Sequence, residues 1–162
     1  MRSNAARAAE PRLNLDRFLP YRFSVLSNRV SDAIARHYSE RFGLTIPEWR
    51  VMAVLGQGGD VSAREVAART AMDKVQVSRA VTSLVAARRV QRETDRADGR
   101  VSRLSLSARG RAIYDEIVPL ALHLEELLLS TLSPDERAAL EELRQRIFDR
   151  AHAETQALGR GK

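Results

Sequence analysis

The stretch ETDRADGRVSRLSL, residues 93–106, combines a chain reversal with two guanidinium groups. Its second half alternates apolar and polar residues, which predicts one strand of a β-hairpin with Gly99 at the tip. Arg96 and Arg100 flank that tip, and Asp98 lies between them. A hairpin that only reverses the chain needs no arginines, so we expect this loop to present them to an anionic partner. Asp98 has an alternative role that involves no partner: it favours the turn itself, because Asp before Gly is a favourable turn pair.

A second set of candidate residues lies on a helix predicted over about 74–88. One face of its helical wheel is apolar, and the opposite face carries an arginine, an amide and hydroxyls but no carboxylate. These side-chain types read base edges in the major groove of DNA, whereas an ordinary solvated face, the alternative, usually carries Glu–Lys pairs. The predicted core face comprises Val77, Val81, Leu84 and Val85. The predicted DNA contacts are Lys74, Val75, Gln76, Ser78, Arg79, Thr82 and Ser83.

Basic charge is concentrated around these two segments. Of the 27 Lys and Arg and 21 Asp and Glu in the chain, residues 62–112 hold 12 and 5, a net charge of +7, and the remaining residues carry −1. A focused basic segment is the electrostatic footprint of a protein that binds a polyanion. A helical adaptor whose basic face binds an acidic protein would carry the same charge, and that class stays open as the alternative.

The rest of the composition excludes several other classes. The 162 residues include no cysteine, which excludes disulfides, thiolate metal sites and cysteine redox sensing. The three histidines are scattered and no Gly-rich phosphate loop is present, so we predict no catalytic residues, no metal site and no cofactor. No apolar run reaches membrane-spanning length, and we expect a cytoplasmic protein without membrane contact.

Capping boxes, in which a helix-start side chain pairs with Glu or Gln three residues on, mark four helix starts. The starts are Thr45, Ser62, Asp73 and Ser133, and the helices predicted from them cover about 46–57, 63–70, 74–88 and 134–157. A long first helix should stop at Gly43, and another should cover about 108–131 with a kink at Pro119. Strands are confined to the hairpin and a two-residue stub near Val61.

This order of elements predicts a mainly α fold with a small β-hairpin (α+β), a winged helix-turn-helix flanked by long dimerisation helices. The segment IVPLALHLEELLL, residues 117–129, is apolar on more than one side, so we expect a homodimer; a monomer with a compact helical cap is the alternative. The predicted organisation is a disordered tail 1–12, an N-terminal dimerisation helix 13–44, a winged helix-turn-helix domain 45–107, C-terminal dimerisation helices 108–158 and a flexible tail 159–162.

Residues 65–110 resemble the core of the MarR family of bacterial transcriptional regulators. The family pattern has a basic residue, D-x-x-D-x-R and then L-[ST]-x-x-G, and the corresponding positions are Arg92, Asp95, Asp98, Arg100, Leu106, Ser107 and Gly110. The resemblance extends over about residues 13–157. One departure is Gly99, where the family often has a second arginine, so this wing has one fewer phosphate contact.

The resemblance implies a homodimeric repressor that binds a pseudo-palindromic double-stranded operator and is released by a small ligand. Recognition helices would enter successive major grooves, and the wing arginine, Arg100, would enter the minor groove with Asp98 directing it. Arg96, Ser62 and Arg64 are expected on the DNA backbone.

The resemblance also implies an effector crevice, commonly for anionic or phenolic molecules, between the dimerisation helices and the DNA-binding lobe. An indole face and arginines could hold an aromatic carboxylate there. The alternative places Trp49 in the core and the arginines on the surface or in dimer salt bridges. The candidate lining residues are Tyr21, Arg22, Arg29, His37, Trp49 and Arg50.

Overall fold

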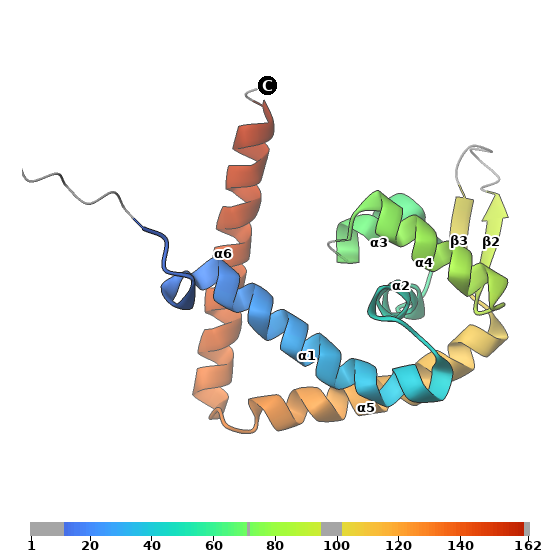
Figure 1. The fold of residues 1–162 in the computed structure, drawn as a ribbon, viewed down its shortest axis with the longest axis horizontal. Helices are drawn as coiled ribbons and strands as arrows, with labels where there is room; N and C mark the ends of the chain where they lie inside the picture. The colour runs from blue at the N-terminus through green and yellow to red at the C-terminus, as the bar shows by residue number, and fades with distance from the viewer. Residues whose placement is uncertain (1–11, 71, 95–101, 161–162) are drawn as a thin grey trace, which may run out of the picture. The chain divides into compact units, whose positions relative to one another are not determined.

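The computed structural model describes residues 12–70, 72–94 and 102–160 (Figure 1). The chain forms two compact units, Met1–Ile117 and Val118–Lys162, and helix α5 runs through the boundary between them. The fold is mainly helical with one small antiparallel sheet, as predicted. In chain order the elements are η1 (Leu15–Arg17), α1 (Leu19–Phe42), α2 (Ile46–Gly56), β1 (Val61–Ser62), α3 (Ala63–Thr70), α4 (Lys74–Ala86), β2 (Val90–Thr94), β3 (Ser102–Leu106), α5 (Ala108–Leu129) and α6 (Pro134–Arg160).

The predicted helix starts are confirmed by their hydrogen bonds. The capping box of α2 is complete, with the carboxylate of Glu48 accepting from the amide of Thr45 at 2.7 Å. The amides of Ser62 and Ser133 donate in the same way, each at 2.8 Å, to the glutamates three residues on. At α4 the carboxylate of Asp73 accepts from the Gln76 amide at 2.7 Å. These bonds satisfy amides that the first helical turn leaves without partners.

Helix α4 ends at Ala86 and not at the predicted residue 88. The amides of Arg88 and Arg89 turn back to the carbonyls of Val85 and Leu84, each at 2.9 Å, which is the pairing of a Schellman motif. This motif requires a left-handed residue, and Arg88 supplies it at φ 55°. Glycine usually occupies such a position, so the sequence lacks the stop signal that Gly43, at φ 59°, provides for α1.

The buried face of α4 is rotated from the predicted one. Val77, Val81 and Leu84 are buried as expected, but Val85 is 36% exposed. Ala80 is buried in its place. The apolar side therefore centres nearer to Ala80 because α2, α3 and β2 all pack against α4, a constraint that the helical wheel alone does not contain.

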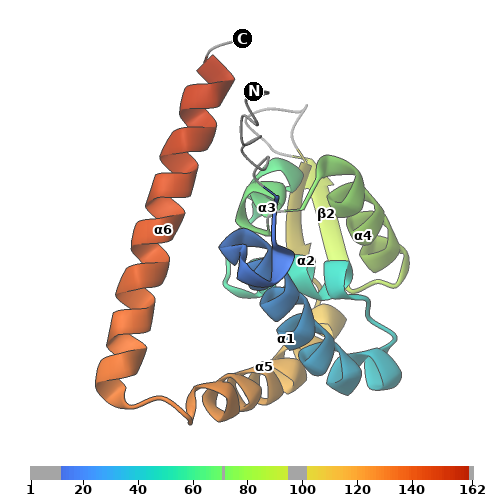
Figure 2. The ribbon, with the colours of Figure 1, turned by 60° about the vertical axis from the view of Figure 1, so that its left-hand side comes forward.

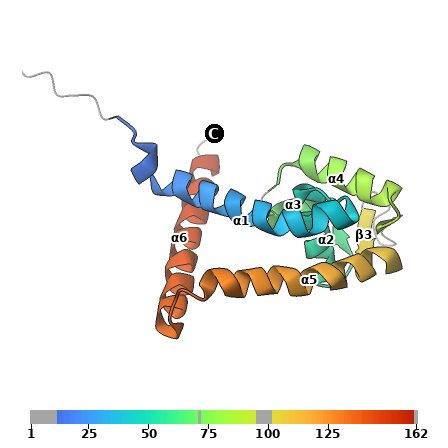
Figure 3. The ribbon, with the colours of Figure 1, turned by 60° about the horizontal axis from the view of Figure 1, so that its bottom comes forward.

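The first unit encloses a continuous core. Helices α2, α3 and α4 pack on one another, and β2 lies beside α4 (Figures 2 and 3). The sheet has the order β1-β3-β2, with Val61 opposite Leu104 and Val90 opposite Leu106 in antiparallel register. Val61, Val90 and Leu104 face the helices and are buried. The two strands of the predicted hairpin and the stub near Val61 are thus confirmed.

The second unit, described from Val118 to Arg160, consists of the end of α5 and the whole of α6. Helix α6 continues to Arg160, so the first two residues of the predicted flexible tail are helical instead. Helix α5 is assigned without interruption through Pro119, and the kink expected there stays a prediction. Within the described ranges, no helix is both long and apolar enough to cross a membrane.

Candidate nucleic-acid interface

The predicted DNA-contacting side chains of α4 all lie on its exposed surface. Because the buried side centres between Val77 and Leu84, the outward direction centres on Val75, Arg79 and Thr82. Neither Lys74 nor Arg79 has a carboxylate partner among the described residues. The exposed set is Lys74, Val75, Gln76, Ser78, Arg79, Thr82 and Ser83.

A cleft of about 330 Å³ separates one edge of this surface from the start of α2. Gln76, Arg79 and Ser83 border the cleft from α4. The opposite wall is formed by Thr45, Pro47 and Glu48. Gln76 and Ser83 therefore lie on the side of α4 that faces α2, which we call the shoulder. Arg79 borders the cleft and also lies in the outward direction of the helix.

The α2 wall of the cleft includes a buried carboxylate that joins α2 to α4. Glu48 is only 8% exposed. Its Oε2 accepts from the amide and the hydroxyl of Thr45, at 2.7 and 2.8 Å, and its Oε1 accepts from the Ser83 hydroxyl at 2.5 Å. Burial favours the neutral acid, but the hydrogen bonds from Ser83 and Thr45 and the charge of Arg89 outweigh it and hold the pKa of Glu48 below its usual range.

Arg89 connects the same region to the end of α1. Its guanidinium donates to the carbonyl of Phe42 at 2.5 Å, while its Nε is buried without a partner in the described structure. Its own carbonyl accepts from the amide of Ser107, at 3.0 Å, just before α5. Gly110 packs so closely on that carbonyl that a Cβ at this position would lie 1.9 Å from the oxygen. The end of α1, the end of α4 and the start of α5 thus meet at Arg89.

Ser62, the last residue of β1, and Arg64 on α3 are both predicted to contact the DNA backbone, and they have different surroundings. The hydroxyl of Ser62 donates to the carboxylate of Glu65 at 2.6 Å and accepts from the Glu65 amide at 3.3 Å, so it caps the helix. The hydrogen bonds from Ser62 lower the pKa of Glu65, and Arg103 on β3 lies 3.6 Å from the same carboxylate. Arg64 is exposed on α3.

The predicted wing is described only along its strands. Residues 90–94 pair with residues 102–106 in antiparallel register, with Glu93 opposite Arg103. The tip residues assigned to DNA contact, Arg96, Asp98, Gly99 and Arg100, lie outside the described residues. Their roles stay predictions.

The structure divides the predicted effector residues between two places. Tyr21, Arg22 and Arg29 line a groove of about 370 Å³ along η1 and α1. Trp49 lies elsewhere, half-buried between Tyr38 and Tyr114, with ring centroids 5.6 and 5.9 Å away. Arg50 donates to the hydroxyl of Ser31 at 3.4 Å, and His37 is exposed. Among the described residues, Tyr21, Arg22 and Arg29 thus share one groove, and Trp49, Arg50 and His37 are not part of its lining.

The aromatic stack belongs to the core. Tyr38 is 1% exposed, and burial raises the pKa of its phenol to about 12, although the nearby charge of Arg50 opposes the shift. Trp49 and Tyr114 pack against the same core cluster. Among the described side chains, no group of His, Asp and Glu is arranged to hold a metal ion.

Sequence reasoning missed Glu48 and Arg89. The sequence predicts Glu48 only as a helix cap, because its bond to Ser83 spans 35 residues. Arg89 follows Arg88 in a basic run that resembles any solvated segment. For Arg89 the available signal is its position between the predicted helix and the strand that begins at Val90, and no local signal pairs Glu48 with Ser83.

Comparison with known proteins assigns the fold. The sequence profile of the MarR family matches residues 42–101. A MarR family transcriptional regulator from Silicibacter pomeroyi DSS-3 has 28% sequence identity and a TM-score of 0.73, covering 85% of this chain and 98% of its own. No curated protein sequence matches the chain.

Two further solved structures share the fold. A MarR/EmrR family regulator from Acinetobacter sp. ADP1 has 24% identity and a TM-score of 0.79, covering 87% of this chain and 99% of its own. The Bordetella bronchiseptica protein BpsR, whose DNA binding is regulated by 6-hydroxynicotinic acid, has 24% identity and a TM-score of 0.74, covering 86% and 99%.

Proposed function

Since the chain belongs to the MarR family, we propose that it is a sequence-specific DNA-binding transcriptional regulator that acts as a homodimer and is released from its operator by a small ligand. The observation that carries the proposal is the outward surface of α4. It is exposed, presents Arg79 and Lys74 without carboxylate partners among the described residues, and lies in a segment of net charge +7.

The side chains on that surface suit the edges of base pairs. The fork of Arg79 matches the two acceptors of guanine, and the methyl groups of Val75 suit a thymine methyl. Lys74, in the first turn of α4, is placed for a phosphate contact. Gln76 lies on the shoulder beside the cleft, from which it can reach an adenine.

The wing is proposed to add a minor-groove contact. Strands β2 and β3 extend toward the tip that carries Arg100, and the negative potential of a narrow minor groove attracts a guanidinium. We assign Arg100 to this groove, Asp98 to directing it and Arg96 to the backbone.

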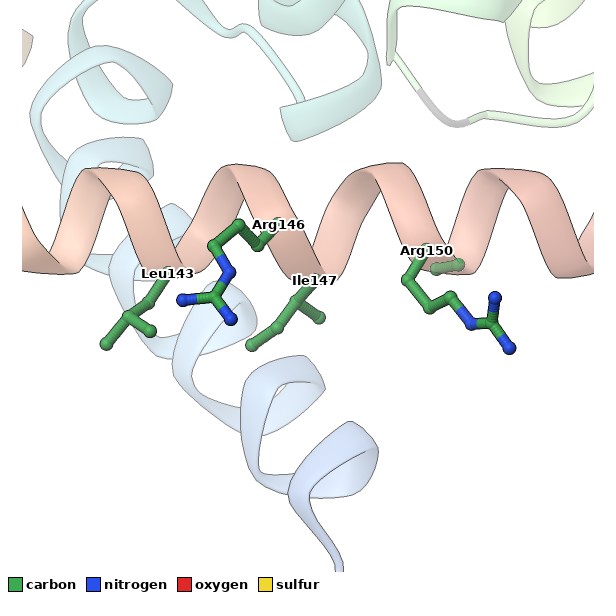
Figure 4. Close-up of a pocket in the computed structure, with 5 residues that line it drawn as sticks. Leu143, Arg146, Ile147 and Arg150 are labelled. Atoms are coloured by element: carbon green, nitrogen blue, oxygen red, sulfur yellow. The ribbon is translucent and has the colours of Figure 1, made fainter.

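The dimer is proposed from apolar surfaces that the chain leaves uncovered. On α6, Leu143 and Ile147 are 51% and 44% exposed and project from the same side of the helix (Figure 4). They line a groove of about 480 Å³ with Arg146 and Arg150. Exposed apolar side chains also occur on α1 and on the end of α5. An apolar surface of this extent in a soluble chain marks an interface, and a second copy of the same chain is the partner with matching surfaces.

The effector site is proposed at the groove of Tyr21, Arg22 and Arg29. Two guanidinium groups beside a phenol ring suit a small aromatic carboxylate. BpsR, which shares the fold, responds to a molecule of that chemical class. Release of operator DNA by the ligand is the repressor mode that we propose.

The first test is operator selection. Random duplexes are selected for binding to the full chain, and the selected sequence is compared with random DNA in gel shifts with excess heparin. We expect a two-fold symmetric sequence that binds about 10³-fold or more tightly than random DNA. A basic adaptor for an acidic protein would yield no sequence and would be displaced by heparin.

The second test is Arg79→Ala. Loss of one bidentate base contact should cost about 1–3 kcal/mol per half-site and relax the preference at one base pair, with non-specific binding nearly unchanged. Arg36→Ala, which removes the same charge from an exposed position on α1, is the matched control. An Arg79→Ala protein that keeps the wild-type ratio of operator to random DNA affinity would show that α4 does not read bases.

A further inference from the structure

The side of α4 that packs against the rest of the first unit is apolar, and apolar contacts are non-directional. Val77, Ala80, Val81 and Leu84 form the buried side. Apolar packing fixes how close a helix lies but sets its rotation only through side-chain shape. A base-reading helix needs its rotation fixed to place an arginine fork on one base pair.

The bond between Ser83 and Glu48 is the one side-chain hydrogen bond between α4 and α2 among the described residues. It is directional and charge-assisted, since the carboxylate is ionised. Ser83 lies one turn beyond Arg79 and three residues before the end of α4, on the shoulder that borders the cleft. A bond at that position resists rotation of the helix, which would move Ser83 away from α2.

Glu48 is itself held on several sides. Two bonds from Thr45 fix its Oε2 at the start of α2, and the charge of Arg89 compensates its burial. Arg89 is in turn bound to the carbonyl of Phe42. The acceptor that Ser83 meets is therefore a fixed point of the first unit and not a mobile surface side chain.

From this geometry we infer that Glu48 is a positioning residue for DNA recognition, which fixes the rotation of α4 through Ser83 without touching DNA. The inference rests on the proposed function. It also revises the role of Ser83, whose single hydroxyl proton is donated to Glu48 and is not available to a base.

The test uses the full chain and the operator obtained by selection. Ser83→Ala and Glu48→Ala each remove the link, from opposite sides. Each should lower the ratio of operator to random DNA affinity about tenfold, the factor that corresponds to 1.4 kcal/mol. The double variant should lose no more than the larger single loss, because both changes break one interaction. Glu48→Gln, which keeps the shape and one acceptor, should restore most of the ratio.

Ser31→Ala is the matched control. It removes a serine hydroxyl of α1 that accepts from Arg50 of α2 at 3.4 Å, but it keeps the bond between Ser83 and Glu48 and every bond that holds Glu48, so the ratio should stay within about twofold of wild type. A folded Glu48→Ala protein with the wild-type ratio would overturn the inference. So would a further loss when Ser83→Ala is added to Glu48→Ala, because Ser83 would then act on DNA directly.

A measurement without DNA separates this inference from the proposed function. Amide hydrogen exchange in the free protein should be faster in α4 of Ser83→Ala than in wild type, with α3 as the internal reference. If wild type selects no operator but α4 exchange responds in this way, the proposed function fails, while the role of the Ser83–Glu48 bond in holding α4 stands. Unchanged exchange in α4 overturns that role.

Discussion

The two compact units of the chain bury their apolar side chains to very different degrees. Among the described residues, seventeen apolar residues are buried, and all of them lie between Tyr38 and Ile117. The described residues 118–158 include no buried side chain, and even the large apolar residues Leu122, Leu127 and Phe148 are each more than half exposed. Similar apolar content thus serves two purposes, since the first unit closes a core by itself and the second presents a surface to be covered from outside.

The largest expected effect comes from placing charge on the uncovered surface. Leu143→Asp together with Ile147→Asp should dissociate the proposed dimer. The two side chains are about half exposed in one copy, so burial of the four in a dimer is worth about 3–6 kcal/mol, half of the roughly 1.5–3 kcal/mol for each fully exposed side chain. Light scattering should report a monomer, and operator affinity should fall with it. Gln145→Asp, on the opposite side of α6, is the control. A double variant that remains a stable dimer would place the interface elsewhere.

The next effect belongs to the first unit. Gly110→Ala introduces a Cβ that would lie 1.9 Å from the Arg89 carbonyl, so α5 and β2 must separate. Such overpacking should lower the free energy of unfolding by about 1–3 kcal/mol in chemical denaturation. The loss should not depend on protein concentration, in contrast to the α6 variants. A wild-type denaturation midpoint would mean that α5 does not pack on that carbonyl.

Acid should also act on the first unit through Glu48. Its pKa is lowered in the folded state, so its contribution to stability is present above the pKa of the unfolded chain and is lost as pH falls through the folded pKa. Melting temperatures recorded from about pH 7 to pH 3 should therefore fall less steeply for Glu48→Gln than for wild type. Glu126→Gln, at an exposed glutamate of the second unit whose pKa is lowered by Arg137, should change that slope less. Equal slopes for wild type and Glu48→Gln would contradict the lowering of the Glu48 pKa by its hydrogen bonds and by Arg89.

The smallest expected effect is an increase in the stability of the first unit. Arg88 occupies a left-handed conformation that glycine adopts without strain, so Arg88→Gly should stabilise the first unit by about 0.5–1 kcal/mol. The control is Arg92→Gly on β2, where glycine should destabilise. A lower melting temperature for Arg88→Gly would show that the side chain of Arg88 makes a stabilising contact.

Most of the fold can be predicted from local sequence signals. The capping boxes at Thr45, Ser62 and Ser133 depend on residues three apart, and the sequence therefore locates those helices to within a few residues. The predicted end of α4, residue 88, lies two residues too late. The turn that ends the helix has Arg88 at the left-handed position, where a glycine would have signalled the end. The rotation of the buried face, which exchanged Val85 for Ala80, depends on neighbours from three other elements.

The candidate site shows the same division. The exposed side chains of α4 could be named from helical periodicity, since that is a property of the helix alone. The partner of Ser83 could not, because Glu48 lies 35 residues away and already had a complete role as a cap. The six effector candidates were grouped by analogy, and the structure separates Tyr21 and its neighbours from the stack around Trp49.

That stack makes the chain its own optical probe. Trp49 is the only tryptophan, and it lies between two tyrosine rings contributed by α1 and α5, with centroids 5.6 and 5.9 Å away. At such distances the tyrosines transfer excitation to the indole efficiently, so the emission of a single residue reports how three helices of the first unit pack. Movement of α1 or α5 against α2, whether caused by a ligand, by DNA or by a second copy, becomes a change in intrinsic fluorescence that requires no label.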